Sequence, residues 1–269
     1  MNPIKLKTMD KGFLIDMDGV IYSGNDLIPG ADTFIAQLQK KEIPFLFMTN
    51  NSQRSPIDVV NKLRPMGIKV NEENVYTSAM ATAWFLSFTH PNGTAYVLGE
   101  GGLISSLHNN GYSLVTQDPD YVVIGEGRNF TLEMANKAVD MVLGGAKLIA
   151  TNFDPSPKKI GWSNLGIKAI VKMIEEATGK RAFSVGKPSP VMMRAARKKL
   201  GLTTDQTIVI GDTMDTDILG SIQMGYKTIL TLSGVSKRAD LGDYAFAPDM
   251  IIDSLEGFDL DKALEKLSE

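Results

Sequence analysis

Two carboxylates stand close together near the start of the chain, where a strand would end. Asp16 and Asp18 come directly after the apolar run Gly12–Ile15, and Gly19 follows them at once. In extended backbone the side chains of residues i and i+2 point to the same side, so both carboxylates can face one pocket. Such a pair can attack an electrophile, move a proton or bind a cation. A lone aspartate here would be an ordinary turn or capping residue, but the next acidic cluster argues against that interpretation.

That cluster follows a second apolar run, Thr207–Ile210, which leads through a glycine into Asp212, Asp215 and Asp217. Carboxylates that are brought together repel one another and raise each other's pKa unless a cation joins them. Carboxylate oxygens and water are the ligands that Mg²⁺ prefers. The two clusters together therefore predict a magnesium site.

Hydroxyl, amide and amino groups follow two other apolar runs. Thr49, Asn50 and Asn51 come after Pro44–Met48. They supply a hydroxyl, two amides and backbone N–H groups at a helix start, which we expect to be free to bind an anion. For Asn51 the alternative role is to cap the helix that follows it. Lys187 stands between a glycine and a proline, and its ammonium group can neutralise both a carboxylate and a bound phosphate.

The elements that must position these residues alternate between short apolar runs and amphipathic segments. The predicted strands are Gly12–Ile15, Pro44–Met48, Ala95–Leu98, Tyr121–Ile124, Lys147–Ala150, Phe183–Val185, Thr207–Ile210 and Thr228–Leu232. The predicted helices are Asp32–Lys41, Pro56–Met66, Leu132–Leu143, Ile167–Thr178 and Pro190–Leu200. This alternation predicts an α/β fold whose parallel sheet is covered on both faces. Ligands of such sheets bind at the carboxyl ends of the strands, where the candidate residues lie.

Composition narrows the function further. The chain has 269 residues, enough for two domains, with 43% hydrophobic and 22% charged residues. Its net charge of -3 leaves no basic excess for a phosphate backbone, so we expect no nucleic-acid partner. The absence of cysteine excludes disulfides and thiolate nucleophiles and fits a cytoplasmic protein. No apolar run approaches the roughly 20 residues that span a bilayer, and the N-terminus does not read as a signal peptide.

Two short segments resemble each other. Tyr96–Gly102 and Val122–Arg128 each consist of an apolar run followed by glycine, glutamate and glycine. The simpler interpretation is a pair of similar strand-to-helix turns in one domain. The alternative is a nucleotide-binding glycine loop, for which a single G-x-G is weak support.

Four motifs in this order resemble those of the haloacid dehalogenase superfamily of phosphatases. They are Asp16-Met17-Asp18-Gly19, Thr49, Lys187, and Gly211-Asp212 with Asp217 five residues after Asp212. The resemblance extends from about residue 11 to 260. It implies a Rossmann-like doubly wound core of parallel strands.

Spacing indicates where a second domain is inserted. Thr49 and Lys187 are 138 residues apart, far more than one sheet connection needs. We therefore predict a core formed by residues 1–80 and 181–269 and an inserted α/β cap formed by residues 81–180. In the superfamily this is a class II cap. The segments around Thr49, Tyr76, Tyr96 and Val185 resemble its IIA branch, which includes NagD-like and p-nitrophenyl-phosphate phosphatases.

The resemblance assigns roles around the metal. It implies that Mg²⁺ is bound by the side chains of Asp16 and Asp212 and by the carbonyl of Asp18, with Asp217 bound directly or through water. Asp16 is then the nucleophile that becomes an aspartyl phosphate, and Asp18 is its acid/base partner. Thr49, Asn50 and Lys187 are implied to hold the phosphate.

The cap is expected to select the substrate. The segment after Lys147–Ala150 keeps a Thr-Asn-x-Asp pattern, and we predict that Asn152, Asp154, Lys158 and Trp162, together with Asn50 and Asn51 of the core, contact the substrate. Trp162 can stack on a ring of the substrate or fill the core of the cap.

A small phosphorylated metabolite, either a sugar phosphate or a nucleoside monophosphate, is the expected substrate, and pyridoxal phosphate stays open. Phosphoryl transfer to an acceptor, as in mutases, and non-catalytic binding of a phosphometabolite are the alternative functions. We expect no membrane partner, and the sequence leaves a homodimer open.

Overall fold

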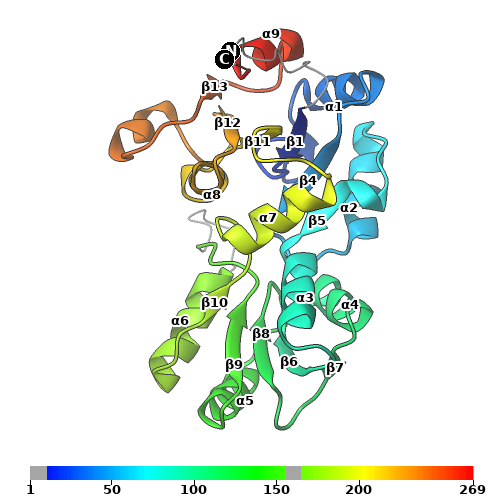
Figure 1. Cartoon of the computed structure of the whole chain (residues 1–269). Coiled ribbons are helices and arrows are strands. Elements are labelled where there is room, and N and C mark those ends of the chain that lie inside the picture. The colour runs from blue at the N-terminus through cyan, green and yellow to red at the C-terminus, as the bar shows by residue number, and fades with distance from the viewer. Residues whose placement is uncertain (1–10, 156–164, 269) are drawn as a thin grey trace, which may run out of the picture. The chain divides into compact units, whose positions relative to one another are not determined.

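The computed structural model describes residues 11–155 and 165–268, and it divides into two compact units. The first, the core unit, consists of Met1–Met48, Val60–Val75 and Met193–Glu269. The second, the cap unit, consists of Thr49–Val59 and Tyr76–Met192. Figure 1 shows each unit as a sheet with helices packed on it.

The sheet of the core unit has six strands. Their spatial order is β13 (Met250–Ile252), β12 (Lys227–Thr231), β11 (Thr207–Gly211), β1 (Gly12–Ile15), β4 (Phe45–Thr49) and β5 (Val75–Thr77). Pairing is parallel from β13 to β4. Residues of β1 and β11 are buried throughout, as expected for central strands of a sheet that is covered on both faces. The predicted doubly wound α/β fold is confirmed.

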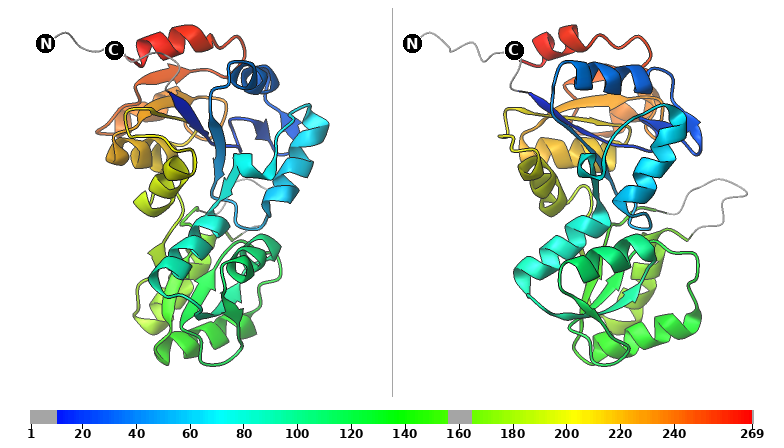
Figure 2. Two further views of the ribbon diagram at one scale, coloured as in Figure 1. Left: turned by 45° about the vertical axis from the view of Figure 1, so that its right-hand side comes forward. Right: turned by 90° about the vertical axis from the view of Figure 1, so that its right-hand side faces the viewer.

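Helices lie on both faces of this sheet (Figure 2). They are α1 (Ala31–Lys40), α2 (Pro56–Leu63), α7 (Pro190–Lys199), α8 (Leu219–Met224) and α9 (Leu260–Lys266). Smaller elements are the antiparallel pair β2 (Tyr22–Ser23) and β3 (Asp26–Leu27), the 3-10 segments η2 (Arg64–Met66), η3 (Glu72–Asn74) and η5 (Arg238–Asp243), and the π-turn η4 (Met214–Ile218). Aromatic rings fix α1 on the sheet, because Phe34 packs edge-on against Phe13 at 5.7 Å between centroids.

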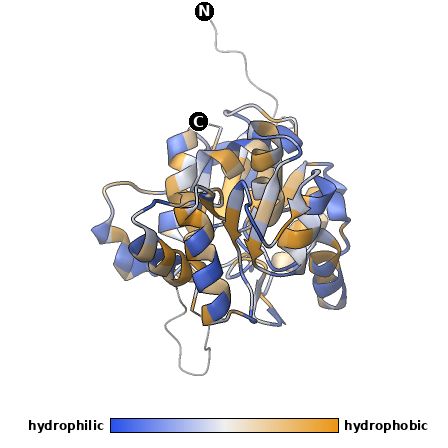
Figure 3. Ribbon diagram, turned by 90° about the horizontal axis from the view of Figure 1, so that it is seen from below, coloured by the Kyte–Doolittle hydropathy of each residue, from blue (hydrophilic) through white to orange (hydrophobic). Residues whose placement is uncertain are grey.

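The sheet of the cap unit is also parallel. Its order is β10 (Phe183–Ser184), β9 (Lys147–Ala150), β8 (Tyr121–Ile124), β6 (Thr94–Leu98) and β7 (Ser113–Leu114). On one face, α5 (Leu132–Leu143) and α6 (Ile167–Thr178) pack against the alternate side chains of β6, β8 and β9. Figures 1 and 2 show α3 (Ser78–Thr89) and α4 (Gly101–Asn109) on the other face. In Figure 3 the strands are mostly orange, between helices in which blue and orange alternate.

Several elements were absent from the sequence prediction. The strands β1, β8 and β9 and the helices α5 and α6 have the predicted bounds, whereas β5, β13, α3 and α4 were not predicted. Helix α3 has the sequence SAMATAWFLSFT, which is apolar on every side and lacks the amphipathic period that was used to recognise helices. The strands β5 and β13 have only three residues each, too few for a period to show.

The boundaries between the two units differ from the predicted domain boundaries. Thr49–Val59, residues 76–80 and residues 181–192 were assigned to the core, but they belong to the cap unit. Hydrogen bonds explain this, because Asn50 and Ser52 bond to residues that lie between 126 and 187. That the second unit covers an active site stays a prediction.

Candidate active site

Three buried carboxylates lie together in the core unit. Asp16, Asp212 and Asp217 each offer an oxygen, and these oxygens lie within 4.8 Å of one another. The sheet register brings the first two together, since Ile15 pairs with Ile210 and Asp16 N–H donates to Ile210 O at 2.8 Å. Both aspartates thus follow neighbouring parallel strands at the same edge of the sheet.

The side chain of Asp212 is held by its neighbours. Its Oδ2 accepts the N–H of Val235 at 2.6 Å, and its Oδ1 accepts the hydroxyl of Thr213 at 2.9 Å. Gly19 lies close by with φ +84°, where a Cβ would lie 2.9 Å from the Cα of Gly234 and would overlap the Asp212 carboxylate. Only glycine fits both this conformation and this space, which explains the glycine after the first acidic pair.

The third carboxylate reaches the cluster through a π-turn. In η4 the N–H of Asp217 donates to Thr213 O at 3.0 Å, and its carboxylate is fully buried. Asp215 of the same turn is exposed and accepts the hydroxyl of Tyr244 at 3.1 Å. The turn therefore directs Asp217 toward the cluster and Asp215 away from it.

The donor set of this cluster fits a hard divalent cation. Three buried carboxylates whose oxygens lie within 4.8 Å of one another repel when ionised, and a bound cation removes that repulsion. All the ligands are oxygens, which suits Mg²⁺. Asp18 lies two residues beyond Asp16 and is exposed, so its carboxyl group is accessible from solvent.

In the cap unit, the side chain of Asn50 is the centre of a polar network. Its Oδ1 accepts Lys187 N–H at 2.8 Å. Its Nδ2 donates to Lys187 O at 3.1 Å and to Asp154 Oδ1 at 2.9 Å. The network fixes the backbone of Lys187, a residue that is 3% exposed. The side-chain amide of Asn50 is thus hydrogen-bonded within the protein. The predicted contact of Asn50 with substrate would therefore be made by its backbone N–H.

The predicted substrate residues of the cap separate into three cases. Asn152 is fully buried, donates to Asn50 O at 2.7 Å and accepts Asp154 N–H at 2.9 Å, so in this structure its side chain supports the network instead of facing a substrate. Asp154 is partly exposed, and burial raises its pKa, although the Asn50 amide and the charge of Lys187 lower it. Lys158 and Trp162 lie outside the described residues.

The N–H groups of Asn51 and Ser52 are not free, contrary to the prediction. Asn51 N–H donates to Thr49 Oγ1 at 3.1 Å, and Arg54 N–H donates to Asn51 Oδ1 at 3.0 Å, which is the capping role considered for Asn51. Ser52 N–H donates to Glu126 Oε2 at 2.7 Å. Because the Thr49 hydroxyl accepts a bond, its own hydrogen points elsewhere and can be donated to an anion. Sequence reasoning missed Glu126, although it stands in one of the two Gly-Glu-Gly segments.

We expect Gly186→Ala to destabilise the protein by about 1–3 kcal/mol, the usual cost of overpacking. A Cβ on Gly186 would lie 2.6 Å from Asn50 Oδ1 and 3.0 Å from Asn152 Cβ, both in buried side chains. Urea denaturation measures the loss. Gly101→Ala is the control, because a Cβ there meets nothing within 4 Å and should leave the stability equal or slightly higher. Equal stability of Gly186→Ala and wild type would contradict the close packing of this network.

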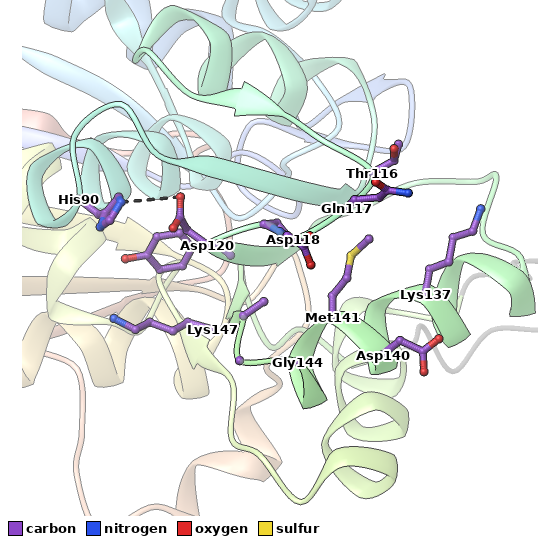
Figure 4. A pocket seen from close by; sticks show the side chains of 14 residues that line it. His90, Thr116, Gln117, Asp118, Asp120, Lys137, Asp140, Met141, Gly144 and Lys147 are labelled. Atoms are coloured by element: carbon purple, nitrogen blue, oxygen red, sulfur yellow. Dashed lines mark ion pairs between the residues drawn. The ribbon is translucent and has the colours of Figure 1, made fainter.

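A pocket of about 700 Å³ lies elsewhere in the cap unit (Figure 4). It is lined by Tyr121 and Lys147, the first residues of β8 and β9, and by the pair His90–Asp120, whose Nε2 and Oδ2 are 3.7 Å apart. None of the site candidates within residues 11–155 and 165–268 lines it. Since ligands of parallel sheets bind at the carboxyl ends of strands, we do not assign the substrate to this pocket.

None of the helices within the described ranges is both long and apolar enough to cross a bilayer.

Comparison with known proteins gives consistent matches. A model of haloacid dehalogenase-like hydrolases matches residues 13–113, and a HAD-hydrolase-like model matches residues 184–258. Among relatives, dihydroxyacetone phosphatase of Corynebacterium glutamicum is 40% identical, over 92% of this chain and 90% of its own. An acid sugar phosphatase of Staphylococcus epidermidis is also 40% identical, over 88% and 92%.

A third relative is similar in both sequence and structure. The ribonucleotide monophosphatase NagD of Escherichia coli K-12 is 38% identical over 93% of this chain and 98% of its own. The solved structure of NagD superposes on this chain with a TM-score of 0.87, and the superposition covers 93% of this chain and 98% of NagD.

Proposed function

Because this chain belongs to the haloacid dehalogenase superfamily, as a NagD-like phosphatase, we propose that it hydrolyses small phosphomonoesters with Mg²⁺ through an aspartyl phosphate on Asp16. The observation that carries the proposal is the buried cluster of Asp16, Asp212 and Asp217 at the carboxyl ends of β1 and β11. Asp16 and Asp212 would hold the ion, together with the Asp18 carbonyl, and Asp217 directly or through water. The bound ion would neutralise charge between the nucleophile and the phosphate dianion.

The chemical steps belong to the two aspartates of the first strand end. A carboxylate oxygen of Asp16 attacks phosphorus, and the bond from phosphorus to the leaving oxygen breaks. Asp18 gives its proton to that oxygen and is then a carboxylate, which takes a proton from water as the water attacks phosphorus. The bond between phosphorus and the Asp16 oxygen breaks, inorganic phosphate leaves, and both aspartates return to their starting states. The exposure of Asp18 supports this role, since it must exchange protons with leaving group and water.

The phosphate oxygens would be held by the Thr49 hydroxyl, the Asn50 N–H and the Lys187 ammonium group. Thr49 is the last residue of β4, and Phe47 of that strand pairs with Ile15. The rigid backbone of Lys187, bonded on both sides to the Asn50 amide, supports its role as a fixed positive charge.

The experiment is an assay of phosphate release with a panel of phosphomonoesters, with Mg²⁺ and with chelator. We expect turnover that depends on Mg²⁺, and borohydride reduction during turnover should trap the acyl phosphate at Asp16. Transfer of the phosphoryl group to an added acceptor in place of water would support the mutase alternative. Binding without turnover would support the phosphometabolite-binding alternative.

We propose that residues of the cap select the substrate, a sugar phosphate or a nucleoside monophosphate. The names of the three relatives refer to different substrates, namely dihydroxyacetone phosphate, ribonucleotides and sugar phosphates. These relatives nevertheless share much of their sequence with this chain. Groups that bind only phosphate and metal cannot separate such substrates, so the discrimination must come from contacts with the leaving group. The cytoplasmic location, the absence of nucleic-acid partners and a homodimer remain predictions.

Asp154→Asn should therefore change the order of preference among substrates. Asp154 is partly exposed beside Lys187 and Asn50, so its carboxylate can accept a hydrogen bond from a hydroxyl or amino group of a leaving group. We expect kcat/KM to shift by about 10-fold for substrates that offer such a donor, the effect of about 1.4 kcal/mol. Activity on a minimal aryl phosphate should stay unchanged. A uniform fall on all substrates together with a lower Tm would show that Asp154 acts only in the network.

A further inference from the structure

The two similar Gly-Glu-Gly turns of the cap unit lie side by side. One follows β6 and the other follows β8, and these strands pair in parallel with Leu98 opposite Ile124. Both turns face the chain segment Ser52–Arg54. A Cβ on Gly102 would lie 2.5 Å from Arg54 O, and one on Gly125 would lie 2.9 Å from Ser52 Oγ. The glycines thus allow close approach of this segment of the same chain, and these contacts do not support the nucleotide-loop interpretation.

The carboxylate of Glu126 holds the backbone of the segment. It accepts the N–H of Ser52 at 2.7 Å and also the N–H of Gln53. In return, Glu126 N–H donates to Ser52 Oγ at 2.8 Å, and that hydroxyl also receives a bond from Thr151 at 3.2 Å. One glutamate therefore orients two successive peptide units.

Glu100 of the other turn holds the side chain next to them. Gln53 Nε2 donates to Glu100 Oε2 at 2.5 Å, and Gly102 N–H donates to Gln53 O at 2.9 Å. The second carboxylate oxygen of Glu100 accepts Arg128 N–H, which ties the two turns together. The segment is thereby fixed by side chains and backbone of both turns.

This segment directly continues the residues proposed to hold phosphate. Asn51 N–H donates to Thr49 Oγ1, so the direction of the Thr49 hydroxyl depends on where the peptide after Asn50 lies. We propose that Glu126 is a positioning residue: it fixes Ser52 and Gln53 so that the Thr49 hydroxyl and the Asn50 N–H are aimed at phosphate. The proposal rests on the phosphatase function proposed above.

The surroundings of Glu126 give its role a pH dependence. Burial raises the pKa of Glu126 to about 7, although the bond from Ser52 N–H lowers it. Among the charged groups near it, Asp154 raises this pKa and Arg54 lowers it. An ionised carboxylate accepts N–H bonds more strongly than a protonated one. The segment should therefore be held best above about pH 7, after Glu126 has lost its proton.

The test compares Glu126→Ala and Glu126→Gln with the control Glu133→Ala, which removes an exposed glutamate from the first turn of α5. The readouts are kcat and KM for an aryl phosphate and the inhibition constant of inorganic phosphate. In Glu126→Ala we expect KM and the inhibition constant to rise about 10-fold or more, with a smaller fall in kcat, because small displacements of positioned groups cost about 10²-fold. Glu133→Ala should behave as wild type.

The conservative variant Glu126→Gln tests the pH dependence of phosphate binding, which a merely structural role would not produce. Glu126→Gln keeps one acceptor and imitates protonated glutamate. Its inhibition constant for phosphate should match wild type below about pH 7 and exceed it increasingly above. Unchanged KM and inhibition constants in both variants, or a fall in kcat alone, would overturn the proposal. If Glu126→Ala does not fold, Glu126→Gln decides.

Hydrogen exchange of the Ser52 and Gln53 amides tests the positioning without activity. We expect faster exchange in Glu126→Ala and no change in Glu133→Ala. Unchanged exchange overturns the positioning role whatever the activity. Faster exchange in a protein that hydrolyses no phosphomonoester supports the positioning and refutes the proposed function instead.

Discussion

Asp16→Asn is expected to lower kcat by about 10³-fold or more while the protein stays folded, because a covalent nucleophile is lost. The amide is nearly the same size as the carboxylate, and the backbone N–H of residue 16 keeps its bond to Ile210 O. Steady-state kinetics with an aryl phosphate measures the loss. Borohydride should no longer trap an acyl phosphate.

Stability gives this experiment an independent control. Asp16 is one of three buried carboxylates whose oxygens lie within 4.8 Å of one another, so its neutralisation removes like-charge repulsion. In the presence of chelator, the Tm of Asp16→Asn should therefore equal or exceed that of wild type. A variant with full activity would disprove the nucleophile assignment. A variant with a strongly lowered Tm would show that the activity loss reflects misfolding.

Asp212→Asn is expected to raise the Mg²⁺ concentration for half-maximal activity by about 100-fold or more. Losing even a group that only supports a ligand typically costs about 10–100-fold in metal affinity, and Asp212 is an anionic ligand candidate itself. The fold should tolerate the change. The amide oxygen can still accept Val235 N–H, and its NH₂ can donate to the Thr213 hydroxyl, which both donates and accepts.

Asp215→Asn is the matched control for Asp212→Asn, because Asp215 is exposed and bonds to Tyr244 instead of joining the cluster. It should leave the Mg²⁺ dependence unchanged. A second measurement is the rise of Tm on addition of Mg²⁺, which follows from binding to the folded state alone. We expect this rise in wild type and Asp215→Asn but not in Asp212→Asn. Greater damage from Asp215→Asn would show that the metal site has been assigned to the wrong residues.

The sequence predicts those parts of the site that depend on residues close together along the chain. Asp16 and Asp212 could be selected because each follows a predicted buried strand, and the alternation of strands with helices predicted a parallel sheet. That β1 and β11 are neighbours in this sheet is shown by the structure alone. The resemblance to the family's motif favoured Asp217 over Asp215, and the π-turn gives the reason, since it turns Asp217 inward. These are local relations, in which a residue's place follows from the few residues around it.

The polar contacts within the cap unit could not be predicted, because they join residues that are distant in sequence. Asn152 was expected at the substrate, yet it bonds to Asn50, 102 residues earlier. The N–H groups after Thr49 were expected to be free, yet Ser52 N–H is taken by Glu126, 74 residues later. Neither partner could be identified from spacing.

The sequence by itself therefore determined the α/β class, the strand ends that carry the acidic residues and the need for an inserted domain, because backbone alternation and side-chain periodicity are short-range properties. Only the tertiary structure decided which polar groups are already satisfied within the protein. Asn50 illustrates the difference: its amide suggests a ligand for phosphate, but the fold brings Lys187 and Asp154 to it. A buried polar group bonds to whatever partner packing provides, and packing joins residues irrespective of their separation along the chain.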